Sequence, residues 1–166
     1  MKRILISAVT LAFLVTLAQL TAAQDLGSQL VGVWAIKSNI NKETATGKVV
    51  GLMGDNPQGF AFFTRGGHFA FVLTAKERKG PAGAQITDAE RAALYATMAA
   101  TTGTFKVDGS KVTLTYVATS NQIWVGTTQT RTIEIAGSKL TWTSPPQKNM
   151  NTGTETVFVI TMERAE

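Results

Sequence analysis

The polar residues with the clearest chemical potential lie on the apolar face of one predicted strand. Within residues 127–135, alternation places Gln129 and Arg131 on the same face as Ile133 and Ile135. The isoleucines indicate that this face points into a core, where an isolated charge costs roughly several kcal/mol. Arg131 must therefore pair with another group of the protein or with a bound molecule.

Two interpretations satisfy that requirement. In the structural one, Arg131 packs on an aromatic ring such as Trp34 and closes one end of the fold. In the functional one, Arg131 acts with Gln129 and Tyr116 on the carboxylate or carbonyl of a bound ligand. The residues predicted to contact a ligand are Arg131, Gln129, Tyr116, Trp34, Trp142 and Phe158.

Other catalytic and metal-binding chemistry finds little support in the residue types. His68 is the only histidine and follows Gly66 and Gly67 at a predicted hairpin turn. No serine or acid stands at a spacing that marks it as a catalytic partner of His68. The chain has no cysteine, and no metal-ligand spacing occurs. The sequence therefore predicts no catalytic residue, no metal site and no cofactor.

Composition also argues against nucleic acid as a partner. The chain has 16 Lys and Arg residues against 11 Asp and Glu, a formal net charge of +5. The basic residues are spread along the chain, and the one cluster, residues 76–79, is interrupted by an acid. We expect that cluster to be a solvated loop. The three tryptophans lack the accompanying basic groove that binds single-stranded nucleic acid.

The N-terminus has the layout of a secretory signal peptide. Lys2 and Arg3 give a positive start, residues 4–20 are mostly apolar, and small residues up to Ala23 precede an expected cleavage. The alternative is an uncleaved membrane anchor, because the apolar run is near the lower limit of roughly 17 residues for a span. We expect cleavage, a secreted or periplasmic protein without a stable membrane anchor, and a single domain over residues 24–166.

The rest of the chain predicts strands joined by short turns. The first strand is expected from Leu30, with Leu30, Trp34 and Ile36 on one face, before a polar stretch at residues 39–47. The strands at residues 59–64 and 68–74 are apolar on both faces. This pattern predicts that one face is interior and that a helix or loop covers the other.

One helix interrupts the strands. Thr87 and Glu90 form a capping box, and the helix is expected to run to about Ala100. Nearly all of the strands are consecutive and hairpin-linked. The order fits an all-β fold, an up-and-down antiparallel β-barrel of eight to ten strands with one inserted α-helix.

A set of short motifs adds a family resemblance. The residues that carry it are Leu30-Val31-Gly32-Val33-Trp34, Thr102-Gly103-Thr104-Phe105-Lys106-Val107-Asp108-Gly109, Trp124-Val125-Gly126-Thr127, Gln129, Arg131, Glu134, Gly137, Leu140 and Pro145-Pro146. In this order they resemble the bacterial lipocalin-like domain family, from about Leu30 to Arg164. The resemblance implies an eight- to ten-stranded barrel with a small apolar cavity. In lipocalins generally an arginine packs on the Gly-x-Trp tryptophan, which is the role that the structural interpretation gives to Arg131.

The sequence leads to three functional hypotheses. The first is a secreted or periplasmic barrel that binds a small hydrophobic or amphipathic ligand in its interior. The second is a cofactor-free cyclase or isomerase, in which Tyr116, Arg131 or His68 supplies one proton or hydrogen bond in the same cavity. The third is a structural or interaction barrel of the cell envelope, filled by its own Phe and Trp side chains.

Overall fold

The computed structural model describes residues 26–149 and 152–166. The predicted signal peptide, residues 1–23, lies outside these residues. The strands are β1 (Gly32–Glu43), β2 (Val49–Gly51), β3 (Gln58–Phe63), β4 (His68–Thr74), β5 (Met98–Asp108), β6 (Lys111–Thr119), β7 (Thr128–Ala136), β8 (Lys139–Thr143), β9 (Gln147–Lys148) and β10 (Glu155–Arg164). The helical elements are a short segment at residues 26–30, α2 (Asp88–Ala96) and the 3-10 turn η1 (Gln122–Trp124).

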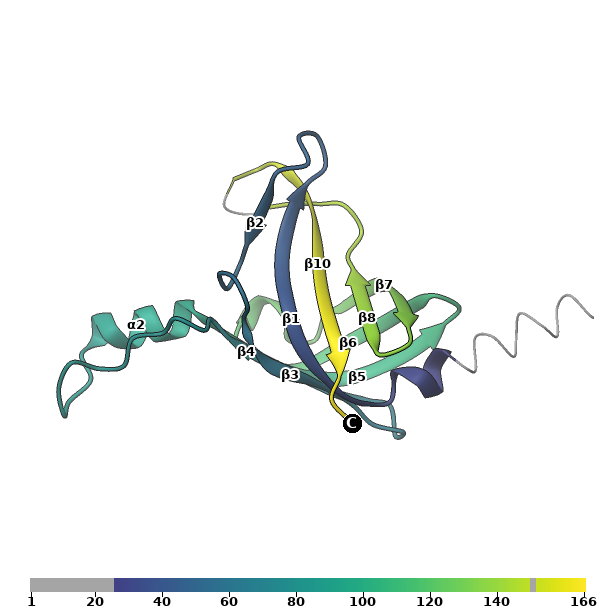
Figure 1. Ribbon diagram of the computed structural model, residues 1–166, viewed down its shortest axis with the longest axis horizontal. Coiled ribbons are helices and arrows are strands. Elements are labelled where there is room, and N and C mark those ends of the chain that lie inside the picture. Colours follow the sequence, from purple (N-terminus) through teal and green to yellow (C-terminus); the bar gives the residue numbers. More distant parts are fainter. Residues whose placement is uncertain (1–25, 150–151) are drawn as a thin grey trace, which may run out of the picture.

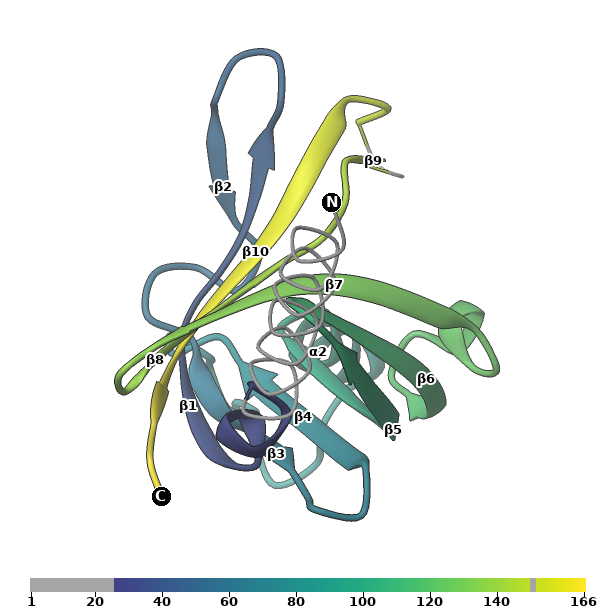
Figure 2. The same cartoon turned by 90° about the vertical axis from the view of Figure 1, so that its right-hand side faces the viewer.

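Eight of the ten strands close into an antiparallel barrel. β1 pairs with β3 on one side and with β10 on the other, and the remaining neighbours follow the order β3-β4-β5-β6-β7-β8-β10 (Figures 1 and 2). β2 and β9 are short additions that pair with residues 40–42 of β1 and 155–156 of β10. Each barrel strand is thus paired on both sides, which removes exposed sheet edges. The predicted up-and-down barrel is confirmed.

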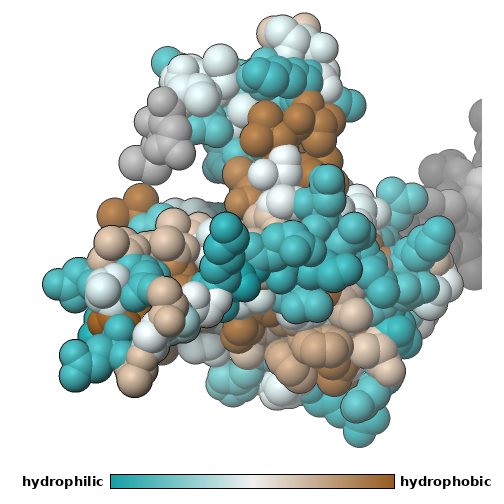
Figure 3. All heavy atoms as spheres, turned by 60° about the vertical axis from the view of Figure 1, so that its left-hand side comes forward, coloured by the Kyte–Doolittle hydropathy of each residue, from teal (hydrophilic) through white to brown (hydrophobic). Residues whose placement is uncertain are grey.

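Tight turns and long connections lie at opposite ends of the barrel. The tight turns after β3, β5 and β7 lie at one end with residues 26–30 and the C-terminus (Figure 1). We call this the closed end. The connections after β1, β4, β6 and β8 contain β2, α2, η1 and β9 and lie at the other, open end. There β1, β2 and β10 rise above the rest of the barrel and form an upper lobe with hydrophobic atoms at its base (Figures 1 and 3).

Alternation within each strand builds the core. In β6, Val112, Leu114 and Tyr116 are buried, whereas the intervening residues point outward. Burying a side chain such as Val or Leu contributes about 1.5–3 kcal/mol relative to leaving it exposed. The same pattern in β10 buries Ile160 and Met162.

β1 differs from its prediction at both ends. Leu30 belongs to the helical segment at residues 26–30, where it is fully buried, and β1 begins at Gly32. The strand then continues to Glu43, into the polar stretch at residues 39–47 where the sequence predicts its end, because residues 38–43 pair with β10. Asn39 is buried on this extension. Pairing with a strand far away in the sequence thus overrides the local preference for a loop.

α2 begins as predicted and ends earlier. Thr87 and Glu90 form the capping box: the Thr87 hydroxyl accepts from the Glu90 N–H at 3.3 Å, and the Glu90 carboxylate accepts from the Thr87 N–H at 2.8 Å. The helix ends at Ala96, because residues 98–104 pair with β4. Arg78, predicted to be solvated, instead donates from Nη2 to the Leu94 carbonyl at 2.9 Å. The insert and the last turn of the helix therefore support each other.

Within residues 26–149 and 152–166, the outer face of β3 and β4 lacks the predicted cover. Phe60, Phe62 and Val72 point outward and are each more than two-fifths exposed. α2 extends away from the barrel and buries none of its own side chains (Figure 1). The inner faces follow the prediction, with Phe63 and Phe69 buried.

Candidate ligand-binding site

Two adjoining hollows lie at the open end of the barrel. The outer hollow has a volume of about 300 Å³ and the inner one about 180 Å³. The outer hollow is lined by Asn41, Leu52, Trp124, Gln129, Arg131, Gln147, Lys148, Asn149, Thr156 and Phe158. The inner hollow is lined by Leu52, Met53, Phe69, Phe71, Ala99, Thr101, Tyr116, Trp124, Arg131, Trp142, Phe158 and Ile160. Four residues, Arg131 among them, line both hollows and join them.

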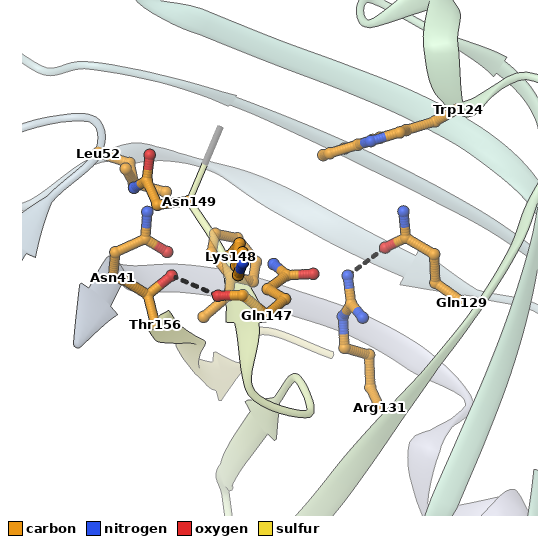
Figure 4. A pocket seen from close by; sticks show the side chains of 10 residues that line it. Asn41, Leu52, Trp124, Gln129, Arg131, Gln147, Lys148, Asn149 and Thr156 are labelled. Atoms are coloured by element: carbon orange, nitrogen blue, oxygen red, sulfur yellow. Dashed lines mark hydrogen bonds between the residues drawn. The ribbon is translucent and has the colours of Figure 1, made fainter. Parts of the chain in front are cut away.

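Arg131 lies at the junction on β7. Its neighbours on the strand, Thr130 and Thr132, face the other way, so Arg131 points inward and is only 6 % exposed. Its Nη1 donates to the Thr130 carbonyl at 3.2 Å, and its Nη2 donates to Oε1 of Gln129. Figure 4 shows the two side chains facing each other. Nε of Arg131 is buried and has no hydrogen-bond partner among the described residues.

Gln129 connects Arg131 to Tyr116. Oε1 of Gln129 also accepts from the Tyr116 hydroxyl at 3.3 Å. β6 and β7 bring these residues together, since Leu114 lies opposite Gln129 and Val112 opposite Arg131 in the pairing. One amide oxygen thus orients a guanidinium and a phenol on the same wall.

Burial shifts the pKa values of Tyr116 and Arg131 without changing their charges at neutral pH. Desolvation raises the pKa of Tyr116, and the Arg131 charge opposes this rise. Desolvation also lowers the pKa of Arg131, which starts from so high a value that the guanidinium keeps its charge at neutral pH. Tyr116 stays a neutral hydrogen-bond donor under the same conditions. Arg131 is therefore a buried cation beside a neutral phenol.

Aromatic rings surround the inner hollow. Trp142 lies 6.5 Å from Phe71, and Tyr116 lies 5.8 Å from both Phe69 and Trp124, measured between ring centroids. These are the spacings of tilted and edge-to-face aromatic contacts. The rings give the inner hollow a largely apolar wall whose polar exceptions include Arg131.

Trp124 reaches the site from the connection between β6 and β7. Asn121 caps η1 by accepting from the Ile123 N–H at 3.4 Å, and Thr127 donates its hydroxyl to the Trp124 carbonyl at 2.7 Å. Gly126, with φ of +76°, turns the chain back toward β7. This corner holds Trp124 over the opening.

The outer hollow is polar on the side across from Arg131. Gln147 and Lys148 come from β9, and Asn41 and Thr156 come from the paired strands β1 and β10 (Figure 4). Thr156 donates to the Gln147 carbonyl at 3.4 Å. These groups form a polar entrance to the apolar interior.

The structure brings together five of the six residues predicted to contact a ligand. Gln129 and Arg131 line the outer hollow, Tyr116 and Trp142 the inner hollow with Arg131, and Phe158 both. Trp34 lies apart from both hollows, fully buried toward the closed end. The ring of Trp34 carries Arg164, whose guanidinium carbon lies 4.2 Å from its centroid. Arg164 therefore holds the position on the Trp34 ring that the structural interpretation gives to Arg131.

His68 also lies away from the site. It is the first residue of β4, beside the tight turn at the closed end, and its side chain is exposed. The Thr64 hydroxyl accepts from the His68 N–H at 3.2 Å, a contact that stabilises the turn. His68 therefore has no part in the cluster around Arg131.

Sequence reasoning did not assign several lining residues to the site. Leu52 and Met53 come from the connection between β2 and β3, and Lys148 comes from β9. Ala99 and Thr101 come from the start of β5, where the sequence predicts the end of the helix at about Ala100. The one available signal was Trp124, which the sequence places at a corner just before the strand of Arg131. The other residues reach the site only through the paths of the open-end connections.

Two further features bear on the type of site. Among residues 26–149 and 152–166, no three His, Cys, Asp or Glu side chains gather as metal ligands would. Within the same residues, no helix has both the length and the apolar character needed to cross a bilayer.

Comparison with known proteins places the chain in a family. A search of curated proteins finds no match. The family model described as a lipocalin-like domain matches residues 31–165, which is most of the chain and the whole of the barrel. The closed eight-stranded antiparallel barrel agrees with this match. The protein therefore belongs to the lipocalin-like domain family.

Proposed function

We propose that this protein binds a small hydrophobic or amphipathic molecule at the open end of its barrel. The observation that carries the proposal is the pair of adjoining hollows, an aromatic inner one that opens through a polar outer one. Together they offer the apolar walls and few polar groups that are typical of small-molecule sites. The N-terminal pattern in residues 1–23 supports a secreted or periplasmic location for this binding.

The size of the inner hollow limits what apolar burial can contribute. A group of about six carbons contributes roughly 5 kcal/mol at about 0.8 kcal/mol per methylene. Association itself costs about 4–15 kcal/mol at the 1 M standard state. Apolar contacts in the inner hollow alone therefore give weak binding, and the polar cluster on β7 matters for affinity.

A filling mutation tests the proposal. We expect Ala99→Phe to block the inner hollow, which Ala99 lines, and to abolish uptake of a fluorescent dye or fatty acid. Ala100→Phe is the matched control, because Ala100 lies on the outer face of β5 beside Ala70 and Val72. Displacement of the dye and native mass spectrometry measure binding. If the wild-type protein takes up nothing in either assay, the proposal fails.

A cofactor-free cyclase or isomerase is the second candidate. It is favoured by the convergence of the Tyr116 hydroxyl and the Arg131 guanidinium on one amide oxygen beside the inner hollow. The test follows a bound molecule by NMR for conversion. Tyr116→Phe and Arg131→Ala should slow conversion at least tenfold, and His68→Ala serves as the control because His68 lies at the other end. Equal rates in all four proteins remove these residues from any mechanism.

A further inference from the structure

Arg131 is a buried cation with no anionic partner in the described part of the protein. The ion pairs there are Lys37 with Glu163 and Arg91 with Asp88. Neither lining set contains an Asp or Glu, and Lys148 adds a second basic residue to the outer hollow. The Arg131 charge is met only by a carbonyl and an amide oxygen. Buried charges in proteins are ordinarily paired, so this arrangement favours the binding of an anionic ligand.

Donor groups in the inner hollow also lack acceptors. Three buried side-chain atoms of the inner hollow have no hydrogen-bond partner among the described residues: Nε of Arg131, Nε1 of Trp142 and Oγ1 of Thr101. Both nitrogens can only donate. A ligand that accepts hydrogen bonds from these donors needs acceptor atoms. A carboxylate has two acceptor oxygens with about four lone pairs.

The volume sets the size of the apolar part of the guest. About 180 Å³ lies between Phe69, Phe71, Trp142 and Ile160. An apolar cavity of about 150 Å³ in another protein is large enough for benzene. Aromatic walls also favour a flat ring, which can make tilted or edge-to-face contacts with them.

We propose that the barrel selects a compact aromatic carboxylate, with one ring in the inner hollow and the carboxylate at Arg131. This inference rests on the proposed binding function and adds the chemical class of the ligand. Arg131 supplies the charge, Trp142 and Thr101 supply neutral donors, and Gln129 holds the guanidinium in place.

Matched pairs of probes test the charge. Isothermal titration compares 3-phenylpropionate with 3-phenylpropanol, and dodecanoate with dodecanol, at neutral pH. We expect the wild-type protein to bind 3-phenylpropionate at least tenfold more tightly than the alcohol. Arg131→Met should remove this preference and leave the alcohol affinity within about threefold, whereas Arg131→Lys should keep part of it because the charge remains.

Two further variants separate local from general effects. Trp142→Phe removes one donor and keeps the aromatic wall, so it should weaken the carboxylate several-fold more than the alcohol. Lys111→Met removes the same charge as Arg131→Met from an exposed position on β6 and should change neither affinity. Thermal melting of each variant confirms that it is folded before titration.

The possible results separate the two proposals. If 3-phenylpropanol binds as tightly as 3-phenylpropionate, or the preference survives Arg131→Met, the inference is overturned while binding stands. If only the twelve-carbon probes bind, the compact ligand class is also overturned. If none of the four probes binds, both this inference and the proposed binding function fail.

Discussion

Arg164 stacks on Trp34 at the closed end of the barrel. Its guanidinium carbon lies 4.2 Å from the centroid of the indole ring, Nη1 donates to the Val31 carbonyl at 3.2 Å, and Nη2 donates to the Gln29 carbonyl. The buried Trp34 donates from Nε1 to the Leu30 carbonyl at 2.8 Å. These contacts tie residues 29–31 to β1 and β10, so groups of the protein itself close this end.

We expect Arg164→Met to destabilise the protein with or without a ligand. The change removes the cation–π contact and leaves carbonyls without their donors, which should lower the free energy of unfolding by about 2 kcal/mol or more. Urea denaturation measures the change. Lys106→Met, on β5, is the control for loss of one surface charge and should have an effect within about 0.5 kcal/mol. A small effect in Arg164→Met would show that the stack does not hold the closed end.

We expect Arg131→Met, unlike Arg164→Met, to have little effect on the stability of the protein without ligand. Methionine fills part of the same space without a buried charge, and such replacements are often neutral or stabilising. The free energy of unfolding without ligand should therefore fall by no more than about 1 kcal/mol, or rise. The same urea experiment tests this. A loss as large as that in Arg164→Met would identify Arg131 as a structural group and remove the basis for ligand contact.

We expect Gly32→Ala to destabilise the closed end of the barrel, because Gly32 lies next to Arg164. Gly32 has φ of +137°, and a Cβ there would lie 2.9 Å from both Nη1 of Arg164 and the Glu166 carbonyl oxygen. We expect a cost of about 2 kcal/mol or more, from backbone strain and displacement of Arg164. Gly109→Ala is matched, because φ is +54° but nothing lies within 4 Å of its Cβ. Its cost should be about 1 kcal/mol, and equal losses in chemical denaturation would contradict the role of the contact.

The capping box should make α2 sensitive to acid. Hydrogen bonds from the Ala82 N–H, the Thr87 N–H and the Thr87 hydroxyl lower the pKa of Glu90 from 4.5. Because the folded pKa is the lower one, the contribution of Glu90 is fully present above 4.5 and is lost as pH falls through the folded value. The protection factors of the α2 amides, which correct exchange rates for their intrinsic pH dependence, should fall over that range. Glu90→Gln should remove this pH dependence and Asp88→Asn should keep it; an unchanged dependence in Glu90→Gln would refute the assignment.

Tyr116 should make the barrel sensitive to base. Burial raises the pKa of its hydroxyl above 10, although the Arg131 charge opposes the rise. A raised folded pKa means that the contribution to stability is fully present below about 10 and is lost as pH rises through the folded value. The free energy of unfolding should therefore fall more steeply above pH 10 in the wild-type protein than in Tyr116→Phe. Parallel curves from chemical denaturation at several pH values would show that Tyr116 is not buried as described.

Local patterns in the sequence determine much of the fold. Alternation in β6 and β10 specifies which side chains face inward, and Gly109 and Gly137 specify tight turns because both have positive φ. Thr87 and Glu90 specify where α2 begins. Each of these signals involves residues close together in the chain, so the sequence predicts them without knowledge of the rest.

Pairings between distant strands decided the features that the sequence placed wrongly. β1 extends to Glu43 because it pairs with β10, and α2 ends at Ala96 because the following residues pair with β4. Local propensity contributes roughly a few tenths of a kcal/mol per residue. Strand pairing and burial contribute more and therefore override it. Only the closed barrel supplies those partners.

Arg131 and Arg164 also show which features the sequence determines and which the tertiary structure decides. Alternation alone places Arg131 on an inward face, but it does not say how far along the barrel the side chain lies. That depth follows from the register of β7 on β6, with Arg131 opposite Val112, and from closure by β1 and β10. The sequence thus determined that Arg131 is buried. The tertiary structure decided that Arg164 takes the ring of Trp34 and that Arg131 faces the open hollows, because depth in a barrel depends on the register of every strand around it.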